Sequence, residues 1–495
     1  MKKLMLAVLV GLMVIATASV AAAEITVGGD LEMRYDLWGN LDLNRAANQQ
    51  LYGTQTQSFF ADRILLNVDA KITEGLEAFV EMDTNVNADK TDERLAGAGT
   101  GAGGYSALNY QGERLAVRQA WINFMVPGIP VGLKVGHQPL ALGHGITLDS
   151  HRYGQDAILL YSKPIDQLLL AGVYVKALEQ SSSTPGVLNG KEHQDVDVWA
   201  GLANYTWAPN NTVGAFYLFG HDGRTTLGGL APGVSVARLN WVGLNADGAL
   251  GPVTYKAEVD YQNINIDVAG NEKGFNNAWA GLLGVGAKAS IVNIGAEAAY
   301  GTGTTGNERF GSQVGNSTGA NGALPGSRTF NTPYGATSYN YAFLYNDKIG
   351  QGAVVGGRFV QGAGGGLGLG DGTGGFGLAN TGYVKVTAAM NPMDRLGVDV
   401  AALYLRASAP SYPSQSRDLG WEVDAHAGYK IYDNLNLDVT GGVFIPGAWY
   451  AYAGRGAALT GISAGDKALT DSSNANSPLK RNTAWGMETK LTVKF

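Results

Sequence analysis

Apolar and polar residues alternate with a period of two along most of the chain. The alternation is clearest at residues 25–37, 253–262 and 422–431. Successive side chains of a β-strand point to opposite faces, so this period predicts strands that are apolar on one face and polar on the other. Soluble antiparallel sheets alternate in the same way, so one such strand does not distinguish a sandwich from a membrane barrel.

The number of strands and their connections narrow the choice. The pattern predicts 18 strands, near residues 24–38, 59–72, 76–84, 113–125, 131–138, 157–162, 167–176, 195–207, 212–220, 236–248, 253–262, 278–288, 292–300, 381–390, 396–406, 420–431, 435–444 and 481–495. Several exceed the roughly 9–11 residues that cross a bilayer, so we expect their ends to project beyond it.

Short and long connections alternate strictly between these strands. The short ones carry turn residues, as at Thr73-Glu74-Gly75 and Asp433-Asn434, whereas residues 39–58 and 85–112 form long ones. Short periplasmic turns and long extracellular loops are the expected asymmetry of an outer-membrane barrel. An even number of strands then places both chain ends in the periplasm.

The stretch 301–380 is the ambiguous part of this prediction. It is rich in Gly, Ser, Thr and Asn, with apolar pieces at residues 339–345 and 353–360. We expect one large loop region here and 18 strands. If both apolar pieces were strands the number would be 20, which is still even.

Composition excludes other classes of protein. Charged residues make up only 16% of the chain, against roughly 25% in soluble proteins. Beyond residues 1–23 no stretch approaches the 18 apolar residues of a spanning helix, and a closed barrel is the other structure that satisfies its backbone in lipid. Zero cysteines exclude disulfides and thiolate metal sites, and no basic patch suggests nucleic acid. We therefore predict an all-β protein, a transmembrane, antiparallel, up-and-down β-barrel.

The N-terminus has the pattern of a secretory signal peptide. Lys2 and Lys3 precede an apolar run that ends in small residues, and we place the cleavage site after Ala23. The expected organisation is a signal peptide at residues 1–23 and one barrel at residues 24–495. The expected location is the outer membrane of a Gram-negative cell, in contact with its lipid and lipopolysaccharide.

The C-terminus is an amphipathic strand that ends in phenylalanine. Leu491, Val493 and Phe495 share its apolar face. Such an ending resembles the assembly signal that the barrel-assembly machinery reads, so we expect that machinery as a partner.

A pore needs no catalytic residue and no cofactor, because charges and constrictions in its lumen set the barrier for each solute. The polar faces of the predicted strands supply candidate pore-lining residues of both charges, namely Arg34, Arg63, Arg118, Lys134, Lys256, Glu258, Asp260, Glu422 and Asp424. The leading functional prediction is passive diffusion of small hydrophilic solutes through a lumen of mixed charge.

Arg118 and Lys134 lie on neighbouring predicted strands and are candidates for a selectivity ladder. The alternative is that they form structural ion pairs within the wall. The strand at residues 113–125 alternates poorly, so its sequence does not fix the direction of Arg118.

Residues 114–160 resemble the alginate-export type of outer-membrane porin. The likeness rests on Arg118-Gln119-Ala120 and on the stretch from Leu133 to Gln138. It implies an 18-stranded monomeric barrel that selects solutes by charge, with loops folded inward. His137 stands where that family has an arginine, and the predicted lumen mixes acids with bases, which argues against a strongly basic conduit for polyuronates.

Two other classes compete with a simple pore. His137, His144 and His151 are spaced by seven near acidic residues, but this spacing matches no zinc signature. We therefore predict neither an enzyme nor a metal site. The remaining alternatives are a conduit that exports an alginate-like polysaccharide and a barrel that serves as a sheath or platform for a secreted partner protein.

Overall fold

The structure is a computed structural model, and it describes most of the chain after the predicted signal peptide. The described residues are 24–40, 56–84, 116–151, 154–178, 196–222, 234–268, 272–303, 328, 330, 339–348, 377–409, 416–451 and 482–495. The predicted signal peptide and its cleavage site lie outside them.

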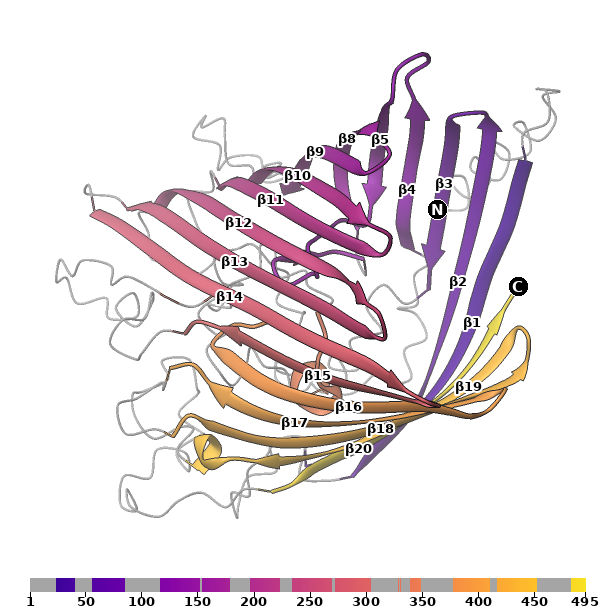
Figure 1. Ribbon diagram of the computed structural model, residues 1–495, viewed down its shortest axis with the longest axis vertical. Helices are drawn as coiled ribbons and strands as arrows, with labels where there is room; N and C mark the ends of the chain where they lie inside the picture. The colour runs from indigo at the N-terminus through magenta and orange to yellow at the C-terminus, as the bar shows by residue number, and fades with distance from the viewer. Residues whose placement is uncertain are drawn as a thin grey trace, which may run out of the picture.

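The described residues form a closed antiparallel barrel of 18 strands. Its strands follow one another around the wall in chain order (Figure 1). They are β1 (Glu24–Gly39), β2 (Gln57–Thr73), β3 (Leu76–Asp83), β4 (Ala116–Met125), β5 (Val131–Gln138), β8 (Gln155–Ile165), β9 (Leu168–Leu178), β10 (Val196–Ala208), β11 (Asn211–Asp222), β12 (Val234–Leu250), β13 (Val253–Val268), β14 (Glu272–Ala289), β15 (Val292–Gly301), β16 (Thr381–Met393), β17 (Leu396–Ala407), β18 (Asp418–Tyr432), β19 (Leu435–Pro446) and β20 (Ala484–Lys494).

The first and last strands close the barrel. β1 pairs antiparallel with β20, and Arg34 lies opposite Lys490 in this register. Two backbone hydrogen bonds between Gly29 and Phe495, of 3.0 and 3.1 Å, extend the pairing to the last residue. Closure leaves no sheet edge, so the backbone donors and acceptors of the wall find partners within it.

The predicted fold class and strand number are confirmed. Each of the 18 predicted strands has a counterpart, within about three residues at most ends, although β13 ends and β14 begins six residues further toward the loop between them than predicted. The 20-strand alternative is wrong, because residues 339–345 are not a strand. They run into η4 (Phe343–Lys348), a short π-helical turn inside the barrel. The other apolar piece, 353–360, lies outside the described residues.

The outer face of the wall is apolar. Every second side chain points outward, and large apolar ones there are exposed, among them Leu244, Leu283, Ile294, Val384 and Val423. Exposure of such a band to water would cost free energy, whereas contact with lipid hydrocarbon would not. Within the part of the chain that the structure describes, no helix is both long enough and apolar enough to span a membrane.

The two ends of the barrel differ in their connections. We call the end with the short turns the turn end and the opposite one the loop end. Gly75 and Gly251 lie in tight turns with φ of 77° and 63°, a region that glycine enters without steric penalty. Both turns were predicted from sequence.

The interior is filled mainly toward the loop end. On the lumenal face of β13, Thr254 near the turn end is exposed, whereas Glu258, Asp260 and Gln262 are buried. Two inserted segments cause this burial. The first is residues 139–151, which include the short hairpin strands β6 (Ala141–Leu142) and β7 (Leu148–Asp149). The second is residues 339–348. A third short element, η6 (Ala448–Ala451), follows β19.

Candidate functional site: a lumen narrowed by two inserted segments

The first inserted segment leaves the wall after β5 and reaches β13. Around the barrel wall, strands β8 to β12 lie between β5 and β13. The segment therefore crosses the lumen. The hydroxyl of Thr147 donates to Oδ2 of Asp260 at 2.6 Å. The backbone N–H of His144 donates to Oε2 of Glu258. These contacts fix the segment to a part of the wall that five strands separate from its origin.

The fold of this segment depends on its own polar and apolar contacts. Ser150 Oγ donates to the carbonyl of Leu140 at 3.1 Å and accepts its N–H at 3.0 Å. Ile146 is completely buried. Gly143 has a φ of 55°, and a Cβ there would come within 2.5 Å of both carboxylate oxygens of Glu258. A glycine therefore allows the backbone to approach the anchoring carboxylate.

The second inserted segment is fixed to β18 by backbone donors. The N–H groups of Leu344 and Tyr345 donate to the two oxygens of Glu422, at 2.5 and 2.8 Å. The N–H of Phe343 lies 3.3 Å from Oδ2 of Asp424. A single turn of helix leaves its first N–H groups without intrahelical acceptors, and these carboxylates accept them.

Aromatic side chains hold the same segment against β16. The Tyr341 ring stacks on Tyr383 with centroids 4.4 Å apart, and the Tyr339 and Tyr383 hydroxyls are 2.6 Å apart. Burial raises the pKa of Tyr339, Tyr341 and Tyr345 above the usual tyrosine range. These phenols are therefore neutral at physiological pH.

Both inserted segments use the same kind of anchor. The sequence Glu-Val-Asp stands at residues 258–260 of β13 and at residues 422–424 of β18. In each, the valine is exposed on the outer face and the two carboxyl groups point into the lumen, under an inserted segment. Sequence reasoning proposed these four acids as pore lining and missed their role as anchors. The repeated tripeptide was the available signal.

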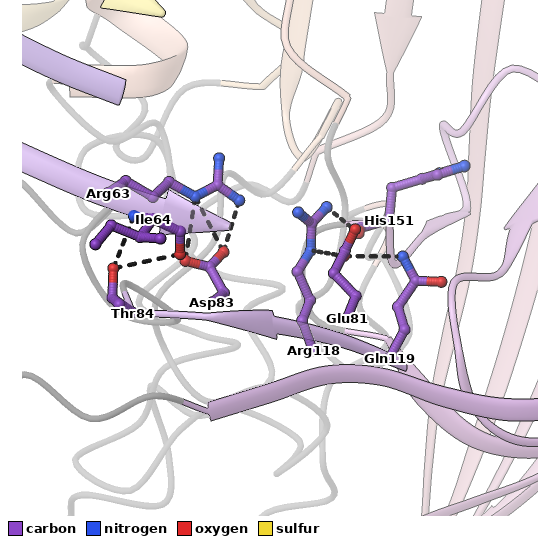
Figure 2. A network of polar contacts seen from close by, with 8 residues as sticks. All are labelled: Arg63, Ile64, Glu81, Asp83, Thr84, Arg118, Gln119 and His151. Carbon is purple, nitrogen blue, oxygen red and sulfur yellow. Dashed lines mark hydrogen bonds and ion pairs between the residues drawn. The ribbon is translucent and has the colours of Figure 1, made fainter. Parts of the chain in front are cut away.

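A polar network on β2, β3 and β4 includes two of the predicted basic residues (Figure 2). Arg63 binds Asp83 through two nitrogens, at 2.6 and 3.0 Å from Oδ2. Arg118 Nε lies 3.4 Å from Oε1 of Glu81, and its Nη2 donates to the backbone carbonyl of His151 at 2.9 Å. Arg118 thus ties the first inserted segment to the wall near its origin.

An irregularity in the wall explains the position of Arg118. The register between β3 and β4 shifts, so that Gln119 pairs with Glu81 whereas Val117 pairs with Met82. Arg118 is the extra residue of this β-bulge. Arg118 and Gln119, although adjacent in sequence, therefore both reach Glu81, as Figure 2 shows. The bulge accounts for the poor alternation of this strand.

The other predicted basic residues also have partners. Arg34 Nε is 2.9 Å from Oδ2 of Asp36, and Lys256 Nζ is 2.5 Å from Oε2 of Glu297. Lys134 places its ammonium 3.6 Å from the centroid of the Trp121 ring, a cation–π contact. The contacts of Arg118 fit the ion-pair alternative, whereas Lys134 has an aromatic partner. A role of either in ion selectivity stays a prediction.

The histidines singled out in the sequence lie in separate contacts. His151 Nδ1 contacts Asp149 at 2.6 Å and His137 Nδ1 contacts Asp156 at 2.8 Å, in separate pairs. Within the described part of the chain, no three or more His, Cys, Asp or Glu side chains are arranged so that they could hold a metal ion.

Sequence reasoning missed one polar triad, which lies toward the turn end. His426 of β18 contacts Asp399 of β17 through Nδ1 at 2.9 Å and Asp438 of β19 through Nε2 at 3.2 Å. All three side chains are partly exposed. The alternation in residues 422–431 already placed His426 on the polar face, but its partners come from other strands.

Comparisons with known proteins relate the chain to solved barrels. No family model matches the sequence. The search of curated proteins finds no match either. Similar solved structures include the outer membrane protein OpdK of Pseudomonas aeruginosa, with 11% identity, a TM-score of 0.48 and coverage of 95% of this chain and 99% of that one. A BenF-like porin of Pseudomonas fluorescens Pf-5 has 12% identity, a TM-score of 0.48 and the same coverages. Acinetobacter baumannii OccAB2 has 13% identity and a TM-score of 0.47, covering 95% and 98%. The alginate-export resemblance gains no support from these structures.

Proposed function

We propose that the chain is an outer-membrane porin that lets small hydrophilic solutes diffuse passively. The observation that carries this proposal is the closed 18-stranded wall, apolar outside and polar inside. Barrels of this size enclose an aqueous channel unless something fills it. Two segments fold into the lumen here, so the passage is the space that they leave.

Selectivity in this proposal comes from size and from paired charges. Arg63, Arg118 and Lys256 each lie against an acidic side chain. The fields of two adjacent opposite charges largely cancel at a distance. Salt screens what remains beyond a Debye length of about 8 Å at physiological ionic strength. We therefore expect weak discrimination between small cations and anions, and stronger discrimination by solute size.

The proposal includes a location and partners. The apolar outer band and the barrel support the Gram-negative outer membrane, with its lipid and lipopolysaccharide as neighbours. The terminal strand with Leu491, Val493 and Phe495 supports recognition by the barrel-assembly machinery. Phe495 is 63% exposed, so its ring is accessible. We propose no catalysis and no cofactor.

Liposome swelling tests the pore directly. Purified protein in liposomes should admit small neutral, anionic and cationic sugars and amino acids at rates that fall with solute size. Boiled protein is the control for leakage. Failure to swell with every solute, in vesicles that contain folded barrel, would contradict the open pore.

The resemblance of residues 114–160 keeps export of an alginate-like polyuronate as an alternative. The paired lumenal charges argue against it, because a polyanion needs an excess of positive charge along its path. Swelling with oligouronates that is faster than with neutral oligosaccharides of equal length would favour this alternative. A sheath for a secreted partner would instead be indicated by a protein that co-purifies and blocks conductance.

A further inference from the structure

Each anchor of an inserted segment brings two carboxyl groups together. In the first anchor, Glu258 and Asp260 are 4% and 0% exposed and lie two residues apart on the lumenal face of β13, so their carboxyl groups are neighbours. One oxygen of Glu258 accepts from His144, and one of Asp260 from Thr147. The other two, Glu258 Oε1 and Asp260 Oδ1, are buried and meet no donor group in the described structure.

The second anchor has the same arrangement. Glu422 is completely buried and uses both oxygens to accept N–H groups of the second inserted segment. Asp424 accepts from Phe343 through Oδ2, whereas its buried Oδ1 finds no donor among the described residues. Asp424 and Glu422 are again neighbours, two residues apart on the lumenal face of β18.

Each pair of carboxyl groups needs a positive charge between or beside them to offset their mutual repulsion. Glu258, Asp260 and Glu422 are buried and Asp424 is partly exposed. Two neighbouring carboxylates with so little water around them cannot readily both carry charge, because their repulsion is weakly screened. The nearest bases have other partners, since Lys256 contacts Glu297 and Lys385 donates to the carbonyl of Tyr341 at 3.0 Å. A metal ion prefers several further oxygen ligands. Two carboxylates and no third acidic or histidine ligand among the described residues fit a proton better.

We propose that each Glu-Val-Asp anchor is a carboxyl pair bridged by one proton, and that these two protons latch the inserted segments inside the lumen. The inference rests on the proposed porin function, which it extends to regulation by pH. Glu258 is the protonated partner in the first pair, where it has a free oxygen facing Asp260. Asp424 is the protonated partner in the second, because Glu422 uses both oxygens as acceptors.

Among the described residues, few other titratable groups face the two pairs. Around the first pair these are Lys256 on the same strand, His144 in the inserted segment and Tyr339 in the second segment, while β12 and β14 contribute Asn245, Gly243, Leu282 and Ala280 opposite it. Around the second pair they are His426, Lys385, Tyr341 and Tyr345, while β17 and β19 contribute Leu403, Ala401, Phe444 and Gly442. The tyrosines are neutral at physiological pH, so they add no charge beside the pairs there.

Loss of the bridging proton at high pH should open the latch. Below the titration of a pair, one proton is shared and both carboxyl groups hold their segment. As the pH rises through that titration, a second negative charge appears and the two groups repel each other. At least one must turn away from the contact, so the segment is released and the passage widens. The latch is therefore closed at neutral pH and open in alkali.

Conductance in planar bilayers tests the latch with proton-mimicking variants. An amide at Glu258 or Asp424 donates to its carboxylate neighbour while its carbonyl still accepts the N–H of the segment. Wild-type channels should show a several-fold rise in conductance, with more flicker, between neutral and alkaline pH. The double variant Glu258→Gln/Asp424→Asn should keep the neutral conductance up to about pH 10, where free tyrosines begin to ionise. The variant Asp30→Asn, which removes a carboxylate on the lumenal face of β1, should retain the alkaline rise. A wild type without a rise, or an equal rise in the double variant, would overturn the latch.

Infrared spectroscopy separates the latch from the porin function. Folded protein in micelles at neutral pH should show the C=O stretch of protonated carboxyl groups, which the double variant loses and a chelator leaves unchanged. If the band is present but the protein carries no current, the porin proposal fails and the proton pairs stand. If the band is absent, or a chelator opens the channel at neutral pH, the pairs hold no proton and the latch is wrong.

Discussion

Thr147 and Asp260, 113 residues apart in the chain, are joined by a buried hydrogen bond of 2.6 Å between a hydroxyl and a carboxylate. Thr147 lies at the tip of the first inserted segment, and Asp260 lies on the lumenal face of β13. This bond, with the contact between His144 and Glu258, decides how far the segment reaches across the barrel. The size of the passage therefore depends on a few polar contacts that can be removed singly.

Removal of the Thr147 hydroxyl should loosen the first inserted segment. Thr147→Val keeps the shape of the side chain but leaves a buried carboxylate oxygen unsatisfied, at a cost of about 1–3 kcal/mol. We expect higher single-channel conductance and more open-channel noise at neutral pH. Thr147→Ser, which keeps the hydroxyl, should match the wild type. Identical current traces for the valine and serine variants would mean that this bond does not hold the segment.

A methyl group at Gly143 should displace the same segment by a different route. Gly143→Ala would bring Cβ against the Glu258 carboxylate, and the residue has a left-handed φ of 55°. Gly128→Ala is a matched control, because Gly128 also has a positive φ, of 82°, but has no atom within 4 Å of its ideal Cβ. Both substitutions carry backbone strain of about 1–2 kcal/mol.

Only the Gly143 variant should change the lumen. We expect Gly143→Ala to raise conductance and to increase the uptake of larger sugars in liposome swelling, with Gly128→Ala close to wild type. Equal size limits in the two variants would show that the backbone of the inserted segment does not border the passage.

Ion selectivity should respond to the loss of lumenal cations. Arg118→Ala leaves Glu81 without its guanidinium and removes the tether to His151, so the lumen gains net negative charge. Lys134→Ala removes a positive charge that has an aromatic partner. Both should shift the reversal potential in a salt gradient toward cation selectivity, and more strongly at low salt, where screening is weaker. Arg118→Lys, which keeps the charge, is the control. Unchanged selectivity in both alanine variants would exclude a ladder built on these residues.

The buried tyrosines predict a second, separate effect of alkaline pH. Burial raises the pKa of Tyr341 and Tyr345, so the folded segment keeps its phenols protonated where a free tyrosine, with a pKa of about 10, ionises. Their contribution to the stability of the segment is fully present below that pH and is lost as the pH rises above it.

Limited proteolysis can measure this loss. Cleavage of the second inserted segment, normalised to an unfolded substrate at each pH, should accelerate above about pH 10. The variant Tyr341→Phe/Tyr345→Phe should flatten the rise, because phenylalanine does not titrate. The proteins with and without the two phenylalanines should both carry Asp424→Asn, so that the carboxyl pair no longer titrates. An equal rise with and without the phenylalanines would assign the alkaline cleavage to other groups.

Much of the barrel was predictable from local pattern. A period of two and the turn residues between strands are properties of neighbouring residues, so the number of strands, their order and their apolar faces could be derived for 24–300 and 381–495. Closure then follows, because neither edge of such a sheet can stay unpaired in lipid. The pattern left the facing of Arg118 open, because a β-bulge interrupts the period there.

The functional site was harder to predict from the sequence, because its contacts join residues that are far apart in the chain. The alternation placed Glu258, Asp260, Glu422 and Asp424 on the polar face, which is as far as a periodic pattern reaches. It could not show that backbone N–H groups of the two inserted segments occupy those carboxylates. His426 and its two aspartates illustrate the same limit, since three strands must be in register before they meet.

The sequence by itself therefore determined an even-numbered, closed barrel with an apolar outer face and a lumen of mixed charge, since each of these depends on residues one or two positions apart. The tertiary structure decided what fills that barrel. It turned residues 339–348 inward as a helical turn where a strand was conceivable, and it buried two carboxyl pairs under inserted backbone. The physical reason is that unpaired N–H groups in a lumen need acceptors, and only the folded wall brings the acceptors within reach.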